Sequence, residues 1–226
     1  MKVTWHRVLV VSGLLLVVAA VAFTPTLLRR VTFFRVRQVE IVGAHYLDES
    51  DVVRYLALPV TASTFDRLAP ARRAAQSVPG VLGATVERRL PGTLRITLRE
   101  ASPVALTALS DRLALMDSAG AVLPFDPTRV PAQLPIATHD SSVAALLARV
   151  KRADRALYER IDAAELDHGD VVFTLGTRRI RLRPEADPDV LHGVSAVIDN
   201  LTTNSRPWRG IDARYRNRVF VEKGAA

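Results

Sequence analysis

The sequence predicts an α+β protein with two folded regions behind an apolar N-terminal segment. Short stretches in which apolar and polar residues alternate indicate half-buried strands, and other stretches repeat apolar residues at helical spacing. Proline and glycine separate the two kinds of stretch. The clearest alternation lies in residues 81–100, VLGATVERRLPGTLRITLRE, which predicts two strands joined at Pro91-Gly92. Leu94, Ile96 and Leu98 are expected on one face of the second strand.

The N-terminal segment predicts a membrane anchor. Residues 1–7 form a short positive tail, and residues 8–28 are apolar over a length that can span a bilayer core, which needs about 20 residues of helix. A cleaved signal peptide is the alternative, because Ala20-Val21-Ala22 resembles a cleavage site. Since long domains are translocated largely regardless of their charge, we expect the rest of the chain outside the cytoplasm.

Composition narrows the functional classes. The net charge is +8, but the arginines are spread along the chain, which is typical of a solvated basic surface. The aromatic and zinc-binding motifs of nucleic-acid binders are missing from the sequence, so no nucleic-acid partner is expected. The sequence contains no cysteine, which excludes disulfides, thiolate metal sites and a cysteine nucleophile.

The first folded region has the predicted order strand, helix, helix, strand, strand. Residues 36–42 alternate as a strand, Asp48 is a candidate N-cap of a first helix, and residues 68–78 predict a second helix before the hairpin. A hairpin needs another element to cover its apolar face. We therefore expect one three-stranded sheet with two helices across one face.

The second region continues with short strands and two longer helical patterns. Ser141 or Ser142 is expected to cap a helix that runs through Leu157, and Asp187 to cap a second, strongly apolar one. Strands are expected at 171–175 and 179–183, and the chain ends in a strand, or a strand with a kink, over 211–221.

Several of these residues resemble a known family. The strand that ends at Gly43, the acidic helix start, the sequence Val78-Pro79-Gly80-Val81 and the hairpin sequence RRLPGTL at 88–94, followed by Glu100 and Pro103, resemble a POTRA domain of the FtsQ/DivIB family of bitopic bacterial division proteins. Leu90 departs from the aromatic residue that is common there. Leu134-Pro135 and residues 211–219 match characteristic positions of the second domain.

This resemblance implies a β-α-α-β-β POTRA domain at 34–102, a mixed sheet with helices on one side at 103–222, and a tail at 223–226. It also implies a non-enzymatic divisome scaffold that recruits FtsB- and FtsL-type proteins for septal cell-wall synthesis. The protein would be a single-pass protein of the inner membrane with a periplasmic body, located at the septum.

By the same resemblance, an FtsB-type partner would pair along the last strand. The partner-binding residues implied in this way are Arg214, Tyr215, Arg216, Asn217, Arg218, Val219 and Phe220. Tyr215 would be an aromatic anchor and the arginines would meet acidic side chains. The alternative is that Tyr215 belongs to the core and the arginines are merely solvated.

No residue pattern indicates catalysis, a cofactor, a metal or a small-molecule substrate. The five histidines stand in no metal-binding spacing, and Asp167-His168-Gly169-Asp170 is interpreted as a polar turn rather than a catalytic dyad. Two alternative functions belong to other classes of protein. A POTRA-containing envelope assembly or export factor would carry a barrel of many alternating segments, and a secreted enzyme would need a convergent catalytic set.

Overall fold

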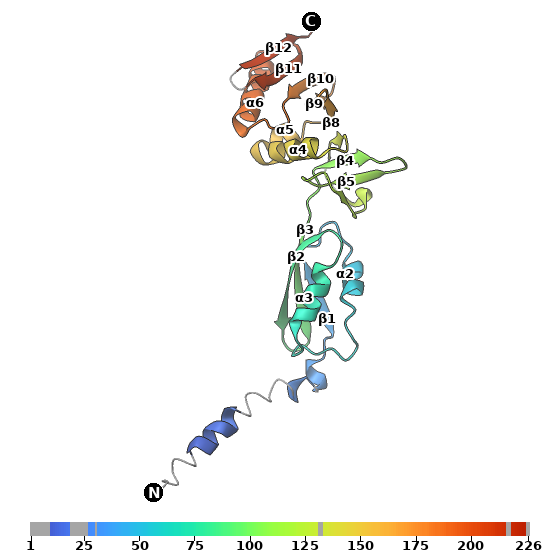
Figure 1. The fold of residues 1–226 in the computed structure, drawn as a ribbon, viewed down its shortest axis with the longest axis vertical. Coiled ribbons are helices and arrows are strands. Elements are labelled where there is room, and N and C mark those ends of the chain that lie inside the picture. Colours follow the sequence, from blue (N-terminus) through green and yellow to red (C-terminus); the bar gives the residue numbers. More distant parts are fainter. Residues whose placement is uncertain (1–9, 19–26, 30, 131–132, 216–217, 225–226) are drawn as a thin grey trace. The chain divides into compact units, whose positions relative to one another are not determined.

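The computed structural model describes residues 10–18, 27–29, 31–130, 133–215 and 218–224. The chain divides into two compact units, Met1–Glu100 and Ala101–Ala226, which we call the N-terminal and the C-terminal unit (Figure 1). Residues 10–18 are helical. Within the described ranges, no helix combines the length and the apolar character needed to cross a bilayer. Much of the predicted span at 8–28, including residues 19–26, lies outside the described residues.

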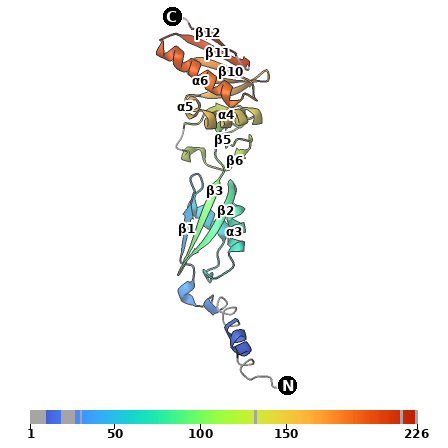
Figure 2. The same ribbon diagram turned by 90° about the vertical axis from the view of Figure 1, so that its left-hand side faces the viewer.

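The N-terminal unit is a three-stranded sheet with two helices. Its elements are the 3-10 helix η1 (Thr32–Phe34), β1 (Gln38–Val42), α2 (Glu49–Leu56), α3 (Leu68–Gln76), β2 (Val81–Arg89) and β3 (Thr93–Glu100). The strand order is β1-β3-β2, so that the second strand of the predicted hairpin occupies the centre (Figure 2). The central strand pairs in parallel with β1 and antiparallel with β2.

The apolar face of β3 supplies the core of this unit. Ile96 is fully buried, and Leu94 and Leu98 are buried beside it, so the alternation predicted from the sequence is confirmed. Val52 of α2 and Ala75 of α3 pack against this face. The two helices therefore cover the hairpin, which removes its apolar side chains from water and stabilises the sheet.

Local signals set the helix limits. The Asp48 carboxylate accepts the backbone N–H of Ser50 at 2.9 Å, which confirms the predicted N-cap. The first helix ends at Leu56, because Ala57 adopts a left-handed conformation with φ of 43°. The second helix ends at Gln76 rather than Val78.

The C-terminal unit is built on a nine-stranded mixed sheet. Its strands are β4 (Ala105–Ala108), β5 (Leu113–Met116), β6 (Val122–Leu123), β7 (Ile136–Ala137), β8 (Ala163–Asp167), β9 (Asp170–Leu175), β10 (Arg178–Leu182), β11 (Trp208–Tyr215) and β12 (Arg218–Lys223). Their order in the sheet is β12-β11-β10-β9-β8-β7-β4-β5-β6. Three pairs are parallel, namely β10–β11, β4–β7 and β7–β8.

Three α-helices, α4 (Ser141–Ala153), α5 (Arg155–Tyr158) and α6 (Pro188–Thr203), pack on this sheet, and the 3-10 helix η2 (Pro127–Arg129) precedes them. Leu147 of α4, Ile198 of α6 and Phe173 of β9 are fully buried in one apolar cluster. Both long helices face this cluster, which explains why apolar residues recur at helical spacing in their sequences.

The helical expectations for this unit need two corrections. The cap of α4 is Asp140, whose carboxylate accepts the N–H groups of Ser142 and Val143 at 2.8 and 3.2 Å, rather than Ser141 or Ser142. The predicted helix through Leu157 is two helices, because Asp154 leaves helical geometry and caps α5 by accepting the N–H of Leu157 at 2.9 Å. The cap of α6 is Asp187, as predicted.

The strands predicted for this unit also need two corrections. β8 was not expected, and it pairs with β9 through the turn at His168 and Gly169, both with positive φ. The single terminal strand expected over 211–221 is the antiparallel pair β11 and β12. In the first case a short polar-rich strand shows little alternation, and in the second no proline or glycine in residues 211–221 signals a break between two strands.

Candidate partner-binding site

The last strand, β12, forms one edge of the nine-stranded sheet. It pairs with β11 on one side, and no described strand lies on its other side. Along that side the backbone N–H and C=O groups of an edge strand are available to a further strand. The predicted open edge at this end of the chain is therefore present in the sheet order.

An aromatic pair stands at this edge. Tyr215 ends β11 and Phe220 lies in β12, and their rings meet edge to face with centroids 5.4 Å apart. About half of each residue is exposed, 48% for Tyr215 and 52% for Phe220. Aromatic side chains bury a large apolar area at low cost in side-chain entropy, so an exposed pair is a suitable anchor for a partner. The alternative that Tyr215 is a core residue does not agree with this exposure.

Arg214 is held by carboxylates of its own chain. Its Nη2 atom donates to Asp212 Oδ2 at 2.7 Å and its Nη1 atom to Asp170 Oδ2 at 3.1 Å. Arg181 extends the network, because it lies 3.6 Å from Asp170 and 2.7 Å from Asp167. These ion pairs, in which aspartates and arginines alternate, link side chains of β9, β10 and β11.

This network shifts the ionisation of both partners. The hydrogen bond from Arg214 holds the pKa of Asp212 below its ordinary value of 3.8, against burial, which acts in the opposite direction. The same hydrogen bond raises the pKa of Arg214 further above its usual range. Both groups are therefore charged at neutral pH, and the guanidinium is fixed in place beside Tyr215, with its Cζ atom 6.0 Å from the ring centroid.

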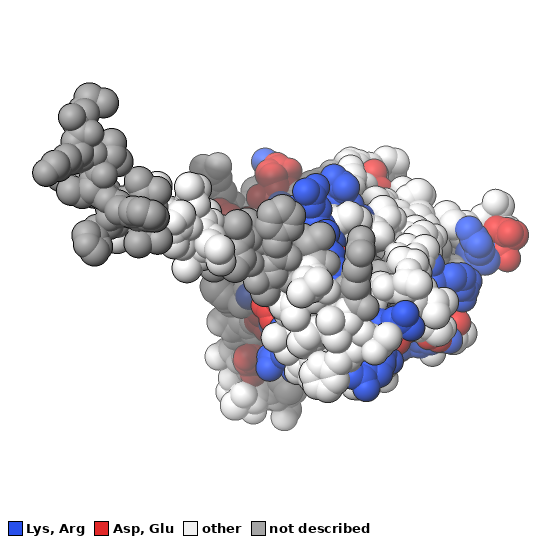
Figure 3. Space-filling model, turned by 90° about the horizontal axis from the view of Figure 1, so that it is seen from below, with Lys and Arg blue, Asp and Glu red and all other residues white. Residues whose placement is uncertain are grey.

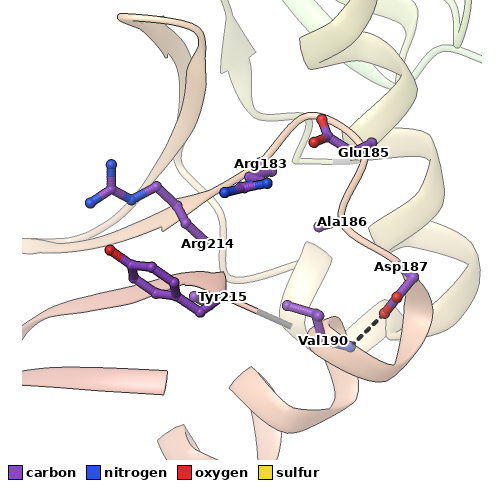
Figure 4. A pocket seen from close by; sticks show the side chains of 8 residues that line it. Arg183, Glu185, Ala186, Asp187, Val190, Arg214 and Tyr215 are labelled. Atoms are coloured by element: carbon purple, nitrogen blue, oxygen red, sulfur yellow. Dashed lines mark hydrogen bonds between the residues drawn. The ribbon is translucent and has the colours of Figure 1, made fainter. Parts of the chain in front are cut away.

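A hollow of about 100 Å³ opens next to these residues. Its lining includes the side chains of Arg183, Glu185, Asp187, Arg214 and Tyr215, and Figure 4 shows Arg183 and Arg214 on the side opposite Asp187 and Val190. Two arginines, Arg183 and Arg214, and two carboxylates, Glu185 and Asp187, line the hollow, so its charges are mixed. A polar side chain of a partner would fit a hollow of this size.

A larger groove lies between β12 and the end of α6. It has a volume of about 500 Å³ and is lined by Leu201, Arg206, Pro207, Val221, Lys223 and Gly224. Val219 is half-buried and packs against the core, so it supports the strand from within. The groove can receive apolar side chains of a strand that pairs with β12.

The structure brings together five of the seven residues implied as partner-binding. Arg214, Tyr215 and Phe220 stand at the edge as described above, Arg218 is exposed in β12, and Val219 faces the core. Arg216 and Asn217 lie outside the described residues. Sequence reasoning did not include the groove residues such as Leu201, or the pairing of Arg214 with Asp170, because each depends on residues distant in the sequence.

The histidine considered as a catalytic group lies in a turn. His168 Nε2 is 3.7 Å from Asp167, and its side chain is 93% exposed. Asp167 is bound more closely by Arg181, at 2.7 Å. No group of three or more His, Asp or Glu side chains within the described ranges is arranged to hold a metal ion.

Comparison with known proteins places the chain. Residues 34–101 match the family described as "POTRA domain, FtsQ-type". A cell division protein FtsQ from Novosphingobium aromaticivorans is 31% identical over 134 residues, and one from Rickettsia typhi is 24% identical over 199 residues. Residues 34–101 thus carry an FtsQ-type POTRA domain, and the chain is similar to FtsQ cell division proteins. Both relatives are named cell division proteins, which agrees with the division role that the resemblance implies.

The matches to FtsQ proteins differ in extent. The first covers 53% of this chain and 42% of that relative, which is less than half of the relative's length, and the second covers 84% and 73%. A solved structure, the major extracytoplasmic domain of the trans isomer of the cell division protein DivIB from Geobacillus stearothermophilus, matches with 14% identity and a TM-score of 0.36, over 47% of this chain and 98% of that one.

Proposed function

We propose that this protein is a membrane-anchored scaffold of the bacterial division machinery that recruits FtsB- and FtsL-type proteins for septal cell-wall synthesis. Residues 8–28 form the single span, the body is periplasmic, and the POTRA domain and the FtsQ-type β domain occupy residues 34–102 and 103–222. One span near the N-terminus keeps the body close to the membrane and raises its effective concentration for other anchored proteins.

The observation that supports this proposal most strongly is the open edge of β12 with the exposed pair Tyr215 and Phe220. A partner segment in extended conformation adds to such an edge through main-chain hydrogen bonds, and its alternating side chains enter pockets on the two faces. Here the polar hollow beside Arg214 lies near the edge, and the groove beside Val221 borders the strand on the side of α6.

The two hollows suggest the chemistry of the partner segment. The hollow, with its mixed charges, favours a polar residue at one position, and the groove lined by Leu201 and Val221 favours apolar residues at others. Because Asp212 and Asp170 already bind Arg214, an incoming carboxylate meets a guanidinium of fixed position, which favours geometric specificity over raw affinity.

Localisation tests the cellular part of the proposal. A functional fluorescent fusion is expected to form a band at mid-cell in dividing cells, and its depletion is expected to produce filaments. A uniform envelope signal together with normal division after depletion would rule the scaffold function out. Fractionation with alkaline washing tests the anchor separately, because a spanning chain stays with the membrane and a secreted one is released.

Cross-linking tests the site. A photo-reactive phenylalanine analogue placed at Phe220 in the full chain is expected to capture an FtsB-type protein in cells. Val122 in β6 is the matched control, because it is exposed on the opposite edge strand of the same sheet. Capture from Val122 but not from Phe220 would move the binding edge to the other end of the sheet.

A further inference from the structure

Three segments of the N-terminal unit meet at the end where the chain enters it. They are residues 31–37, 57–67 and 88–93, and together we call them the entry face. Backbone hydrogen bonds join the first segment to the other two: Val36 N to Ala62 O at 2.9 Å, Thr64 N to Phe34 O at 2.8 Å, and Arg37 N to Gly92 O at 2.8 Å. The lower end of this unit in Figure 1 is formed by these segments.

Side chains reinforce this arrangement. Thr64 is fully buried, and its Oγ1 atom lies 3.1 Å from the carbonyl oxygen of Phe34 and 3.0 Å from that of Pro91. Arg88 donates from Nε to Thr64 O at 2.6 Å and from Nη2 to Asp66 O at 2.9 Å. The backbone of the entry face is thus held from within, and its outward side chains stand on a rigid support.

Each segment of the entry face exposes at least one large apolar side chain. The exposed fractions are 58% for Phe33, 94% for Val60 and 59% for Leu90. Single exposed apolar residues are ordinary, but three on one end of a small domain, drawn from three separate segments, form a shared surface.

Arginines accompany these apolar side chains. The described residues of the three segments together with Arg29 contain six arginines, Arg29, Arg35, Arg37, Arg67, Arg88 and Arg89, and one acidic residue, Asp66. Arg37 lies over the ring of Phe33, with its Cζ atom 5.9 Å from the centroid. Figure 3 views the molecule from this lower end and shows patches of Lys and Arg around a broad surface without charged side chains.

We propose that the entry face docks on a surface of anionic phospholipid headgroups. Phe33, Val60 and Leu90 enter the headgroup region, and the surrounding arginines bind lipid phosphates. Exposed apolar side chains with a cationic rim are the features by which peripheral segments lie in a membrane interface. Arginine is suited to this position because its apolar stem can lie in the interface while the guanidinium binds phosphate.

The position of the entry face along the chain selects a lipid surface as the occupant. Arg29 directly follows the apolar stretch 8–28, and its Nε atom donates to the carbonyl oxygen of Phe65 within the entry face at 3.0 Å. If residues 8–28 span the bilayer, the entry face lies where the chain leaves it. The inference therefore rests on the anchor of the proposed function and adds a second, lipid-specific contact to it.

A depth measurement in lipid discs tests this inference with the full chain. Because the sequence has no cysteine, Val60→Cys and Leu90→Cys each introduce a single site for an environment-sensitive fluorophore. Leu82→Cys is the matched control, since Leu82 is 60% exposed and Leu90 59%, and Leu82 lies at the start of β2 whereas Leu90 directly follows its end. Discs contain either phosphatidylglycerol mixed with phosphatidylcholine or phosphatidylcholine alone, and each carries a quencher attached to the lipid.

In the anionic discs, quenching at Val60 and Leu90 is expected to exceed that at Leu82 several-fold, and the excess is expected to fall in phosphatidylcholine alone. Equal quenching at all three sites, in chains that stay in the discs after alkaline washing, would overturn docking and leave the anchor standing. Release of the chain from the discs by the same wash would overturn the anchor, and the docking inference with it.

Charge variants test the arginines. Arg35→Gln combined with Arg67→Gln is expected to reduce the quenching at Val60 in anionic discs, as is a rise in salt to about 1 M, where charges are screened beyond roughly 3 Å. Arg99→Gln is the control. Arg99 is exposed near the end of β3 that is distant from the entry face, where it pairs with Gly83 of β2. An equal loss in both variants would show that net charge alone, and not the entry face, governs the approach.

Discussion

Both units expose apolar side chains, but the backbone around them differs. At the entry face, Phe33, Val60 and Leu90 stand on a 3-10 helix, a loop and a turn whose amides and carbonyls are bonded to one another. At β12, Phe220 stands on an edge strand whose outer backbone groups face no described strand. A satisfied backbone suits a fluid lipid surface, whereas an open strand edge suits a peptide in extended conformation.

The charges around the two surfaces differ in the same sense. Arginines of the entry face outnumber its carboxylates, which favours a surface of repeated negative charge. Arg214 beside β12 is neutralised by Asp212 and Asp170, so it is a positioned donor rather than a source of long-range attraction. Backbone pairing and charge balance, more than apolar exposure, therefore distinguish the proposed protein-binding surface at β12 from the proposed lipid-binding surface at the entry face.

The largest effect is expected at the β12 edge. Tyr215→Ala combined with Phe220→Ala removes the exposed aromatic pair and should weaken binding of an FtsB-type peptide by at least about 30-fold, because an anchor of this kind contributes roughly 2 kcal/mol or more. Binding is measured by calorimetry, and the fold is checked by the fluorescence of Trp208, which is buried in the same unit. Unchanged affinity in a folded variant would break the distinction between the two surfaces.

The next effect concerns the N-terminal unit alone. Glu100 ends β3, and its carboxylate accepts the N–H groups of His45, Tyr46 and Leu47 at 2.8, 2.9 and 3.0 Å. Glu100→Ala leaves these donors without their acceptor and should lower the free energy of unfolding of this unit by about 2 kcal/mol.

Hydrogen exchange, read separately for the two units, measures the effect of Glu100→Ala. Amides of β1 and β3 should exchange faster, while those of β11 and β12 should not change. Glu87→Ala is the control, because Glu87 is an exposed carboxylate of the neighbouring strand. Faster exchange in both units would show that they do not unfold independently.

A smaller gain is expected in the C-terminal unit. Thr107 in β4 is fully buried, and no partner in the described part of the chain lies within hydrogen-bond distance of its Oγ1 atom. Thr107→Val keeps the shape of the side chain and removes the unpaired hydroxyl, so the unit should become more stable by about 1 kcal/mol. Thermal unfolding followed through Trp208 tests this, and a loss of stability would reveal a bonding role of the hydroxyl.

The smallest effect is expected from acid at the β12 edge. The pKa of Asp212 is lowered in the folded state, first by the hydrogen bond from Arg214. Its stabilising contribution is therefore complete above its ordinary pKa of 3.8 and is lost as pH falls through the lower folded value. The difference in unfolding free energy between the wild type and Asp212→Asn should shrink on acidification below pH 3.8. A difference that grows there would show that folding raises the pKa of Asp212 instead of lowering it.

The sequence by itself determined what neighbouring residues decide. The alternation in residues 93–100 specified which face of β3 is buried, and the caps at Asp48 and Asp187 followed from short polar side chains ahead of helical patterns. The order of elements and the hairpin motif were also enough to indicate the FtsQ-type POTRA fold, which the family match over 34–101 confirms.

Local pattern failed where an element is too short or its signal is shared. The two-residue strand β7 has no period to detect, and it exists because β4 and β8 pair with it. Lys151 has helical spacing that predicts solvent, but the tertiary structure places its Nζ atom 3.0 Å from Pro103 O and over the ring of Tyr158, and burial lowers its pKa.

Only the tertiary structure shows which residues come together at the β12 edge and at the entry face. Asp170 reaches Arg214 across 44 positions of the chain, and the entry face joins segments as distant as Arg37 and Gly92, whose backbones are hydrogen-bonded. Such contacts depend on which strands become neighbours, and that choice minimises the exposed apolar area of a whole unit rather than of any one segment. The residues at the β12 edge were named from the sequence, whereas their neighbours, and the entry face as a surface, exist only in the folded chain.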